Sequence, residues 1–326
     1  MKHSPQSLRQ LLARATLMLL TMTLLTGCEY KDLCYDHRHS DKVYVTFDWQ
    51  KAPHHTATSM TVLFYNLDKP SQQPIRYEYP LSGGTATLQP GRWKAVTYNS
   101  NTEAIRHRGQ EWWNIAEVFT RQSSIEEGTQ LTRGAMPQAT GAEQEQVILE
   151  PDPIWGCVSE EFTLVADGDG YNLVLYPEYR YTTLKVKIVN VPNLKYTEGI
   201  GGAISGVAAS RFISTGEMGQ QMVTEAFTVQ KTGDETLEMS VNIFGRRTDA
   251  PDIAHYLTIY AILADGSKWY YTIDVTDKLQ HAAIDDGNST ISIEVDGLPI
   301  PKPIINGSGF QPVIDSWQGV NIEVTM

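Results

Sequence analysis

The property of this sequence that most constrains its fold is a two-residue alternation of apolar and polar side chains, which recurs from Val43 onward. Successive side chains of a strand point to opposite faces of a sheet, so the alternation is typical of antiparallel sheets with one buried face. Helical periodicity is scarce. The pattern therefore predicts an all-β chain of two tandem antiparallel β-sandwich domains. The predicted strands cover residues 43–49, 60–65, 84–88, 92–99, 146–150, 161–165, 171–177, 180–191, 203–209, 221–230, 237–245, 256–265, 268–276, 289–297 and 320–326.

Two stretches break the strand rhythm. Residues 103–145 are polar and contain glycine, which predicts a long surface excursion with a short helical piece over 111–120. A second short helix is predicted at 277–283, behind an N-cap-like threonine. The Asp-Gly-Asp-Gly sequence at 167–170 is interpreted as the turn of a hairpin that joins the strands on either side. It lacks the further acidic positions that a calcium loop requires.

The first residues of the chain have the composition of a secretory leader. Three basic residues and no acidic one accompany the apolar run 15–25, which is too short to span a membrane. The run ends at Leu-Thr-Gly-Cys, the pattern of a bacterial lipobox. We therefore predict a signal peptide over residues 1–27 and a lipid thioether on Cys28; the alternative is an ordinary signal peptide that ends near a cysteine. Two or three acyl chains, at about 0.8 kcal/mol per buried CH2, would make the attachment permanent.

Charge and length limit the classes of function. Removal of the leader takes away three basic residues and no acidic one, so the net charge of −12 becomes −15. A chain this acidic is not expected to bind nucleic acid. The remaining length suits two domains, which we place at 43–177 and 178–326 behind a juxtamembrane segment 28–42.

Only two further cysteines, Cys34 and Cys157, remain in what is predicted to be an exported protein. A disulfide between them is one interpretation, since the exported compartment favours oxidation. Two free buried thiols are the other. The spacing does not decide between them.

No known catalytic motif is present, and we predict no enzymatic activity, metal or cofactor. Asp36, His37 and His39 are close together and His54-His55 follow, but no further ligand is fixed by spacing. Adjacent carboxylates at 126–127, 160–161 and 285–286 would point to opposite faces of a strand. Glycoside hydrolysis instead needs two carboxylates across one sugar.

Aromatic side chains are the remaining resource for ligand binding. Most of the tryptophans fall in predicted strands, where they are expected to fill the core. Trp112 and Trp113 fall in the excursion instead. They are the pair that we expect to be exposed and to contact a ligand.

With these elements in place, the sequence resembles the fimbrillin-related and fimbrial anchor lipoproteins of Bacteroidetes. The resemblance implies transthyretin-like sandwich domains and assembly outside the cell as pilus subunits. In shaft subunits of that family an arginine-specific protease removes an N-terminal strand, and a neighbour's strand fills the groove. Arg133 follows several predicted strands rather than the first, which disfavours a shaft role. The segments that carry the resemblance are 28–39, 43–49, 60–65, 150–156, 180–191 and 296–301.

The resemblance implies a cell-surface lipoprotein of the outer membrane that acts as a fimbrial anchor or accessory subunit. Its partners would be other fimbrial subunits, bound by strand addition to a sheet edge. Glu29 and Asp32 weakly resemble the acidic tract that directs such lipoproteins to the outer face. The alternative is a surface lipoprotein without a pilus role that binds a glycan or a host protein.

Overall fold

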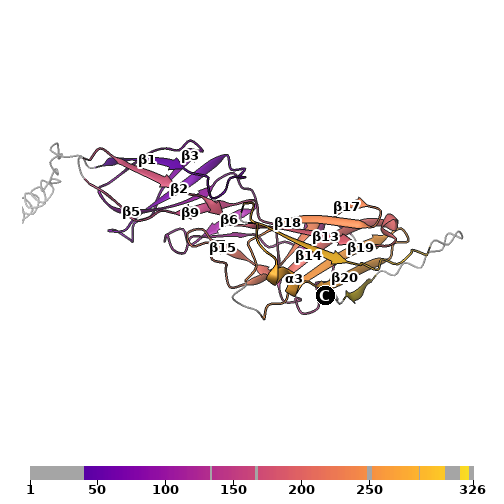
Figure 1. Cartoon of the computed structure of the whole chain (residues 1–326). Helices are drawn as coiled ribbons and strands as arrows, with labels where there is room; N and C mark the ends of the chain where they lie inside the picture. Colours follow the sequence, from indigo (N-terminus) through magenta and orange to yellow (C-terminus); the bar gives the residue numbers. More distant parts are fainter. Residues whose placement is uncertain are drawn as a thin grey trace, which may run out of the picture. The chain divides into compact units, whose positions relative to one another are not determined.

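Strands paired into five sheets make up about half of the part of the chain that the structure describes (Figure 1). The prediction of an all-β fold with sandwich-like domains is confirmed. The described helices are short, and none of them is long and apolar enough to cross a membrane. This computed structural model describes residues 40–132, 134–165, 168–247, 252–285, 287–304 and 316–322.

Two sheets from the first half of the chain enclose an apolar core. The strands are β1 (Asp41–Phe47), β2 (Ser59–Asn66), β3 (Ile75–Pro80), β4 (Gly84–Leu88), β5 (Gly91–Asn99), β9 (Trp155–Val158), β10 (Phe162–Leu164), β11 (Tyr171–Leu175) and β12 (Glu178–Tyr179). The smaller sheet has the order β11-β1-β4. The larger has the order β12-β9-β5-β2-β3, and β10 also pairs with β5.

The first strand shows how alternation sets this core. Val43 and Val45 of β1 are buried, while Lys42 and Tyr44 face outward. Val43 and Val45 pack in one cluster with Trp93 and other side chains of the larger sheet. Full burial of a branched aliphatic side chain contributes roughly 1.5–3 kcal/mol. The alternation of the sequence therefore holds the two sheets face to face.

The second half of the chain supplies most of three further sheets. Their strands are β6 (Ile105–Arg108), β7 (Glu117–Thr120), β8 (Gln146–Ile148), β13 (Thr182–Val189), β14 (Thr197–Ala208), β15 (Ser210–Phe212), β16 (Met222–Thr228), β17 (Gln230–Gly233), β18 (Thr236–Ile243), β19 (Tyr256–Leu263), β20 (Lys268–Asp274), β21 (Thr290–Asp296) and β22 (Trp317–Ile322). The sheet orders are β17-β18-β13-β21, β22-β20-β19-β14-β16-β8 and β15-β7-β6. Figure 1 shows β13, β14, β18, β19 and β20 grouped together.

The prediction that residues 103–145 form a surface excursion is wrong in part: most of the described segment is irregular and not buried, but short pieces of it are paired and packed. The segment contains β6 and β7, which pair with each other, and β7 pairs with β15 from the second half. It also contains the short helix α2 (Ile125–Thr129), and Ile125 and Met136 are buried against Ala226 and Tyr260. The helix predicted over 111–120 is absent, since β7 occupies its end. The segment is mostly polar, and its few buried apolar residues are too widely spaced to form a recognisable pattern.

Burial on both faces explains a second departure from simple alternation. Every residue of β2 after Ser59 is buried, because Val62 and Phe64 face the smaller sheet while Met60 and Leu63 join the other core cluster. Ile105 and Val118 of the excursion belong to that second cluster. The excursion thus contributes to the core that covers the outer face of the larger sheet.

The turn at 167–170 does not form a hairpin. Among the described residues β10 pairs only with β5 and β11 pairs only with β1, so the connection passes from one sheet to the other. The helix predicted near 277–283 is confirmed as α3 (Thr276–His281). The domain boundary near Pro177 stays a prediction. Strand pairs lie across it, since β8 pairs with β16 and β12 pairs with β9.

Candidate functional site

The histidines and carboxylates form no metal centre within the described ranges. No group of three or more His, Cys, Asp or Glu side chains there is placed to hold an ion. The His55 ring stacks on Trp49 with 3.6 Å between ring centroids, and His54 is exposed. Asp36, His37 and His39 lie outside the described residues. His55 therefore has a packing role against Trp49.

The adjacent carboxylates are engaged in local contacts. Glu127 pairs with Arg121, and Glu161 pairs with Arg92. Asp285 accepts hydrogen bonds from the turn that follows it, including one from the amide of Asn288, and Asp286 lies outside the described residues. In each pair, at least one carboxylate is thus engaged in an ion pair or a turn. These contacts do not place two carboxylates in a common cleft.

Trp112 and Trp113 lie in the turn between β6 and β7. The Trp112 side chain is 47% exposed, and the neighbouring apolar side chain of Ile115 is exposed to a similar extent. Trp113 is half-buried, and the Lys94 ammonium lies 4.0 Å from the centroid of one of its rings. Trp93 and Trp155 are buried in the core. The role of Trp112 and Trp113 in ligand contact stays a prediction, and Trp112 is the member of the pair with a free surface.

The Cys157 thiol is buried in β9, at the inner face of the larger sheet. Burial raises its pKa to about 12, so the thiol stays protonated at neutral pH and is a poor nucleophile. The main-chain N–H of Tyr176 lies against the sulfur. Cys157 has no disulfide partner among the described residues. Because Cys34 lies outside them, the disulfide stays a prediction.

A groove of about 490 Å³ opens between Cys157 and β11. One wall is formed by β11 and the residue after it, and the other by the end of β9 and the two residues that follow. The lining residues are Lys51, Cys157, Val158, Ser159, Glu160, Tyr171, Asn172, Leu173, Val174, Leu175, Tyr176 and Glu178.

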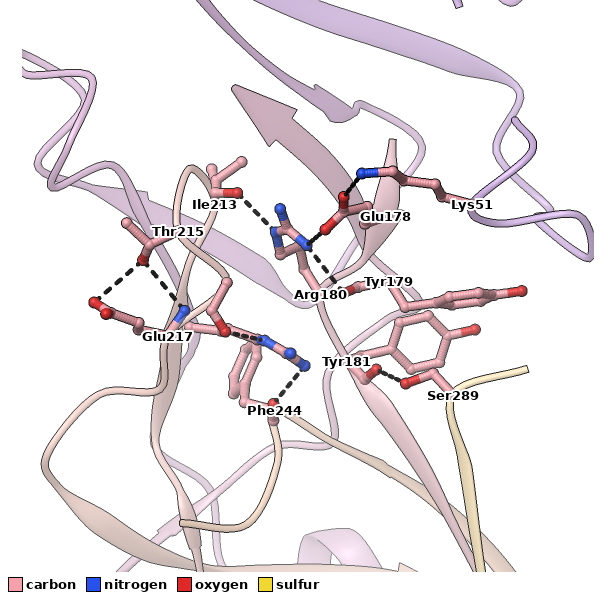
Figure 2. Close-up of polar contacts among 12 residues, drawn as sticks. Lys51, Glu178, Tyr179, Arg180, Tyr181, Ile213, Thr215, Glu217, Phe244 and Ser289 are labelled. Carbon is pink, nitrogen blue, oxygen red and sulfur yellow. Dashed lines mark hydrogen bonds and ion pairs between the residues drawn. The ribbon is translucent and has the colours of Figure 1, made fainter. Parts of the chain in front are cut away.

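One end of this groove is a charged network centred on Arg180 (Figure 2). The Arg180 side chain is only 5% exposed. Its Nε donates to the carbonyl oxygen of Ile213 at 2.7 Å, and its Nη1 donates to Glu178 at 3.1 Å and to the carbonyl oxygen of Tyr179 at 3.3 Å. Glu178 also accepts a hydrogen bond from Lys51. A single guanidinium thus joins β12 to the residues that follow β15.

The charges in this network fix the ionisation of Glu178. Burial works to raise the pKa of this carboxyl, but the hydrogen bond from Lys51 and the positive charge of Arg180 outweigh it. The pKa of Glu178 is therefore lowered from its ordinary value. The same hydrogen bond raises the pKa of Lys51. The end of the groove consequently carries fixed charges of both signs at neutral pH.

Aromatic rings surround the network on its other side. The Trp155 ring lies 5.7 Å from the ring of Tyr181, edge to face, and 6.4 Å from that of Tyr179. The Tyr179 hydroxyl donates to the carbonyl oxygen of Gly287. The Ser289 hydroxyl donates to the carbonyl oxygen of Tyr181 (Figure 2). Residues 178–181 are therefore held by both halves of the chain.

Nothing in the sequence pattern marks Arg180, Glu178 or Lys51 as members of a site. Each is an ordinary charged residue beside a strand or a turn, and the two partners of Glu178 come from positions far apart along the chain. The segments 150–156 and 180–191, which contain Trp155 and Arg180, carry the family resemblance, but the resemblance assigns neither residue to a site. The groove also depends on the order of the strands in the two sheets, which the alternation of apolar and polar residues does not predict.

Comparison with known proteins finds similarity to a family model, to a curated protein and to solved structures. A family model described as a domain of unknown function, DUF5119, matches residues 27–228. A curated Bacteroides ovatus protein, named as a candidate fimbrium anchoring subunit, Fim4B, is 25% identical over 331 residues, covering 92% of this chain and 94% of that protein. The resemblance to the fimbrial anchor family that the sequence shows is confirmed by this relative.

Solved structures share the fold. A candidate adhesin from Bacteroides ovatus is 23% identical with a TM-score of 0.59, covering 85% of this chain and 99% of its own. A structure from Bacteroides thetaiotaomicron, titled as candidate polysaccharide binding proteins, is 8% identical with a TM-score of 0.51 and coverages of 78% and 90%. At these identities the likeness concerns the fold alone.

Proposed function

We propose, on the premise that this chain belongs to the family of the domain of unknown function DUF5119, that it is a cell-surface fimbrial anchor or accessory subunit. The curated relative named as a candidate fimbrium anchoring subunit supports this role, since it aligns with nearly the whole of both chains. The role is one of attachment and requires no catalysis. We place the protein at the outer membrane, held by lipid on Cys28.

The position of β1 is the observation that carries the proposal. β1 lies in the middle of its sheet, with five paired residues on β11 and five on β4. It is also the first described strand after Cys28. Removal of an N-terminal strand, as in the shaft subunits that the sequence resembles, would here split the sheet and separate the body from its lipid. A subunit that keeps this strand suits the end of a filament at the membrane.

The same geometry suits a load-bearing attachment. A pull from the lipid would reach the body through the start of β1. Hydrogen bonds on both edges of the strand and two buried valines, Val43 and Val45, would resist its withdrawal. The core around Val43 and Val45 would therefore hold the end of the chain that leads to the lipid.

Lipid attachment is tested by changing Cys28 to Ser in the full chain. We expect the variant to leave the membrane fraction, because the acyl chains supply the membrane affinity. The matched control is Cys34→Ser, which should stay in the membrane fraction. Membrane association of the Cys28 variant at the wild-type level would refute the anchor.

The fimbrial role is tested by deletion and by co-purification. Cells that lack the chain should shed filaments or lose them from the surface, and the tagged chain should recover a fimbrial subunit from detergent extracts. We propose that the subunit is bound by strand addition to an open sheet edge, where main-chain hydrogen bonds give affinity. Unchanged surface filaments together with recovery of no fimbrial subunit would contradict the proposal.

A second candidate function rests on Trp112. This side chain is 47% exposed, and an aromatic platform of this kind binds sugars and protein surfaces. The chain would then be a surface lipoprotein that binds a glycan or a host protein without a pilus. Glycan arrays with Trp112→Ala and Trp113→Ala separate the two functions. A sugar signal lost in the variants supports the second function, and absence of any signal removes the glycan version of it.

A further inference from the structure

The outer edge of β11 is open in the described part of the structure. β11 is the last strand of the sheet β11-β1-β4 and pairs only with β1. The Leu175 carbonyl oxygen accepts a hydrogen bond from Asp48, so this residue points its main-chain groups toward β1. Main-chain groups alternate in direction along a strand. The N–H and C=O groups of Asn172 and Val174 therefore point outward, away from β1.

The edge lacks the devices that normally protect such strands. Edge strands are usually guarded by charges, prolines or a covering group. β3 carries Arg76, Glu78 and Pro80, and the main chain of Thr87 in β4 is covered by the Tyr77 hydroxyl, which donates to its C=O and accepts from its N–H. The sequence of β11, YNLVL, contains neither a charge nor a proline.

The surface beside this edge is apolar. Val174 is 43% exposed and Tyr176 is 38% exposed, both on the outward side of the sheet. Tyr44 of β1, which is opposite Asn172, is 40% exposed on the same side. Scattered exposed apolar side chains are ordinary, but three that adjoin an unpaired strand edge indicate a place of contact.

Behind the edge lies the groove of about 490 Å³ described above. A strand added to β11 would turn its alternate side chains inward to the groove, toward Cys157 and Leu173, and its other side chains outward, beside Val174. The charged end of the groove, at Lys51 and Glu178, would limit how far an apolar segment extends. The free main-chain groups, the groove and the outer apolar surface thus fit one kind of occupant, an extended polypeptide.

We propose that the free edge of β11 is the docking site for an extended, alternately apolar segment of a partner fimbrial subunit, which pairs with Asn172 and Val174. The inference rests on the proposed fimbrial function. It assigns the contact to the edge strand β11 and not to the central position of the sheet, which β1 occupies. β1 keeps its own position in the sheet while the partner segment becomes the next strand beyond β11.

The test places a photo-crosslinking phenylalanine analogue at Asn172 of the full-length lipoprotein, in cells that carry filaments. The matched control places it at Thr85, an exposed residue on β4 at the opposite edge of the same sheet. We expect a crosslink from position 172, but not from 85, to one extended segment of a fimbrial subunit, identified by mass spectrometry.

Two variants test the hydrogen bonds themselves. Val174→Pro removes an outward N–H that has no hydrogen-bond partner among the described residues, and Val174→Thr keeps it. Val174→Pro should reduce co-sedimentation with filaments sheared from the cells by about tenfold or more, while Val174→Thr should stay within about twofold of wild type. Thermal unfolding of both variants, followed by circular dichroism, confirms that each is folded; if Val174→Pro fails to fold, Val174→Lys replaces it as the edge-blocking charge.

The outcomes separate the inference from the function on which it rests. Filament binding by Val174→Pro at the wild-type level, with wild type bound to filaments, overturns the β11 site and leaves the fimbrial role standing. Crosslinks from position 172 to residues 28–39 of the same chain, or to a second copy, also overturn it. Failure of wild type to bind any filament overturns the proposed function instead.

Discussion

Two buried ionisable residues, Arg180 and Glu225, differ in what surrounds them. Arg180 donates to two carbonyl oxygens and to a carboxylate that is itself paired with Lys51. Glu225 of β16 is fully buried, and neither of its carboxyl oxygens has a hydrogen-bond partner among the described residues. Arg180 is held by acceptors from β12 and from the residue that follows β15, whereas the Glu225 carboxyl has no hydrogen-bond partner in the described part of the chain.

The difference decides which charge the fold can keep. Burial raises the pKa of Glu225 well above its ordinary value, and the negative charge of Glu150 adds to the effect. Glu225 therefore tends to be neutral in the folded protein, because an unpaired buried charge is costly. The Arg180 guanidinium, in contrast, donates hydrogen bonds to acceptors on its neighbours. Acceptors and not burial alone determine whether an interior charge stabilises the fold.

The largest expected effect is the loss of Arg180. Arg180→Met keeps much of the side-chain volume but leaves the carbonyl oxygens of Ile213 and Tyr179 without a donor. Each buried acceptor left unpaired costs about 1–3 kcal/mol, so the loss of a donor to two of them should lower the free energy of unfolding by about 2–6 kcal/mol. Chemical denaturation at pH 7 measures the change.

The control for this variant is Arg121→Met, which removes an exposed arginine that pairs with Glu127. It should shift the denaturation midpoint only slightly, since pairs in water contribute little. Equal shifts for the two arginines would show that the acceptors around Arg180 do not matter to stability.

Glu225→Gln is expected to act in the opposite direction. The carboxyl has a higher pKa in the folded state than its ordinary value of 4.5 in the unfolded state. Below that value both states are protonated and the group contributes no pH dependence. As the pH rises above about 4.5, the unfolded state releases the proton first and gains stability relative to the fold. The glutamine variant should therefore be more stable than wild type at pH 7, by more than about 1 kcal/mol.

The measurement is a pair of denaturation curves at pH 5 and pH 7. The advantage of Glu225→Gln over wild type in the free energy of unfolding should shrink toward pH 5. An advantage of Glu225→Gln that does not change with pH would sink the explanation based on ionisation.

Most strands could be predicted from the sequence, and these two residues could not. Alternation identifies a strand wherever one face is wet, as with Val43 and Val45 in β1. It fails for 103–145, where a few apolar residues are buried by strands distant in the chain. Glu225 lies in a predicted strand at a position that alternation does not mark, and its burial depends on β8 and β14 on either side. Lys51 and Glu178 meet only because of strand order.

Glu150→Gln sharpens the comparison with a smaller effect. Glu150 accepts a hydrogen bond from the main-chain N–H of Asn242 at 2.8 Å, and a glutamine oxygen can accept it equally. The substitution removes the negative charge that helps raise the pKa of Glu225. Burial also raises the pKa of Glu150 itself. The free energy of unfolding at pH 7 should rise by up to about 1 kcal/mol, because a carboxyl with a raised pKa in the fold destabilises the fold at this pH.

The double variant Glu150→Gln/Glu225→Gln tests whether the two carboxyls act on each other. Its gain at pH 7 should be smaller than the sum of the single gains, because either change alone relieves the shared repulsion. Strict additivity in denaturation experiments would mean that the two groups titrate independently.

Lys51→Met gives the smallest expected effect and opposes the Glu225 effect in its pH dependence. Lys51 and Glu178 are 54% and 39% exposed, so the loss of their pair should lower stability by less than about 1 kcal/mol, and less still at high salt. The pKa of Glu178 is lowered in the fold, so its contribution is present above pH 4.5 and is lost as the pH falls. Wild type should therefore lose its advantage over Lys51→Met in acid, which denaturation at pH 3.5 and pH 7 measures. A loss at pH 7 as large as that of Arg180→Met would mean that Lys51, and not the carbonyl acceptors, holds the network together.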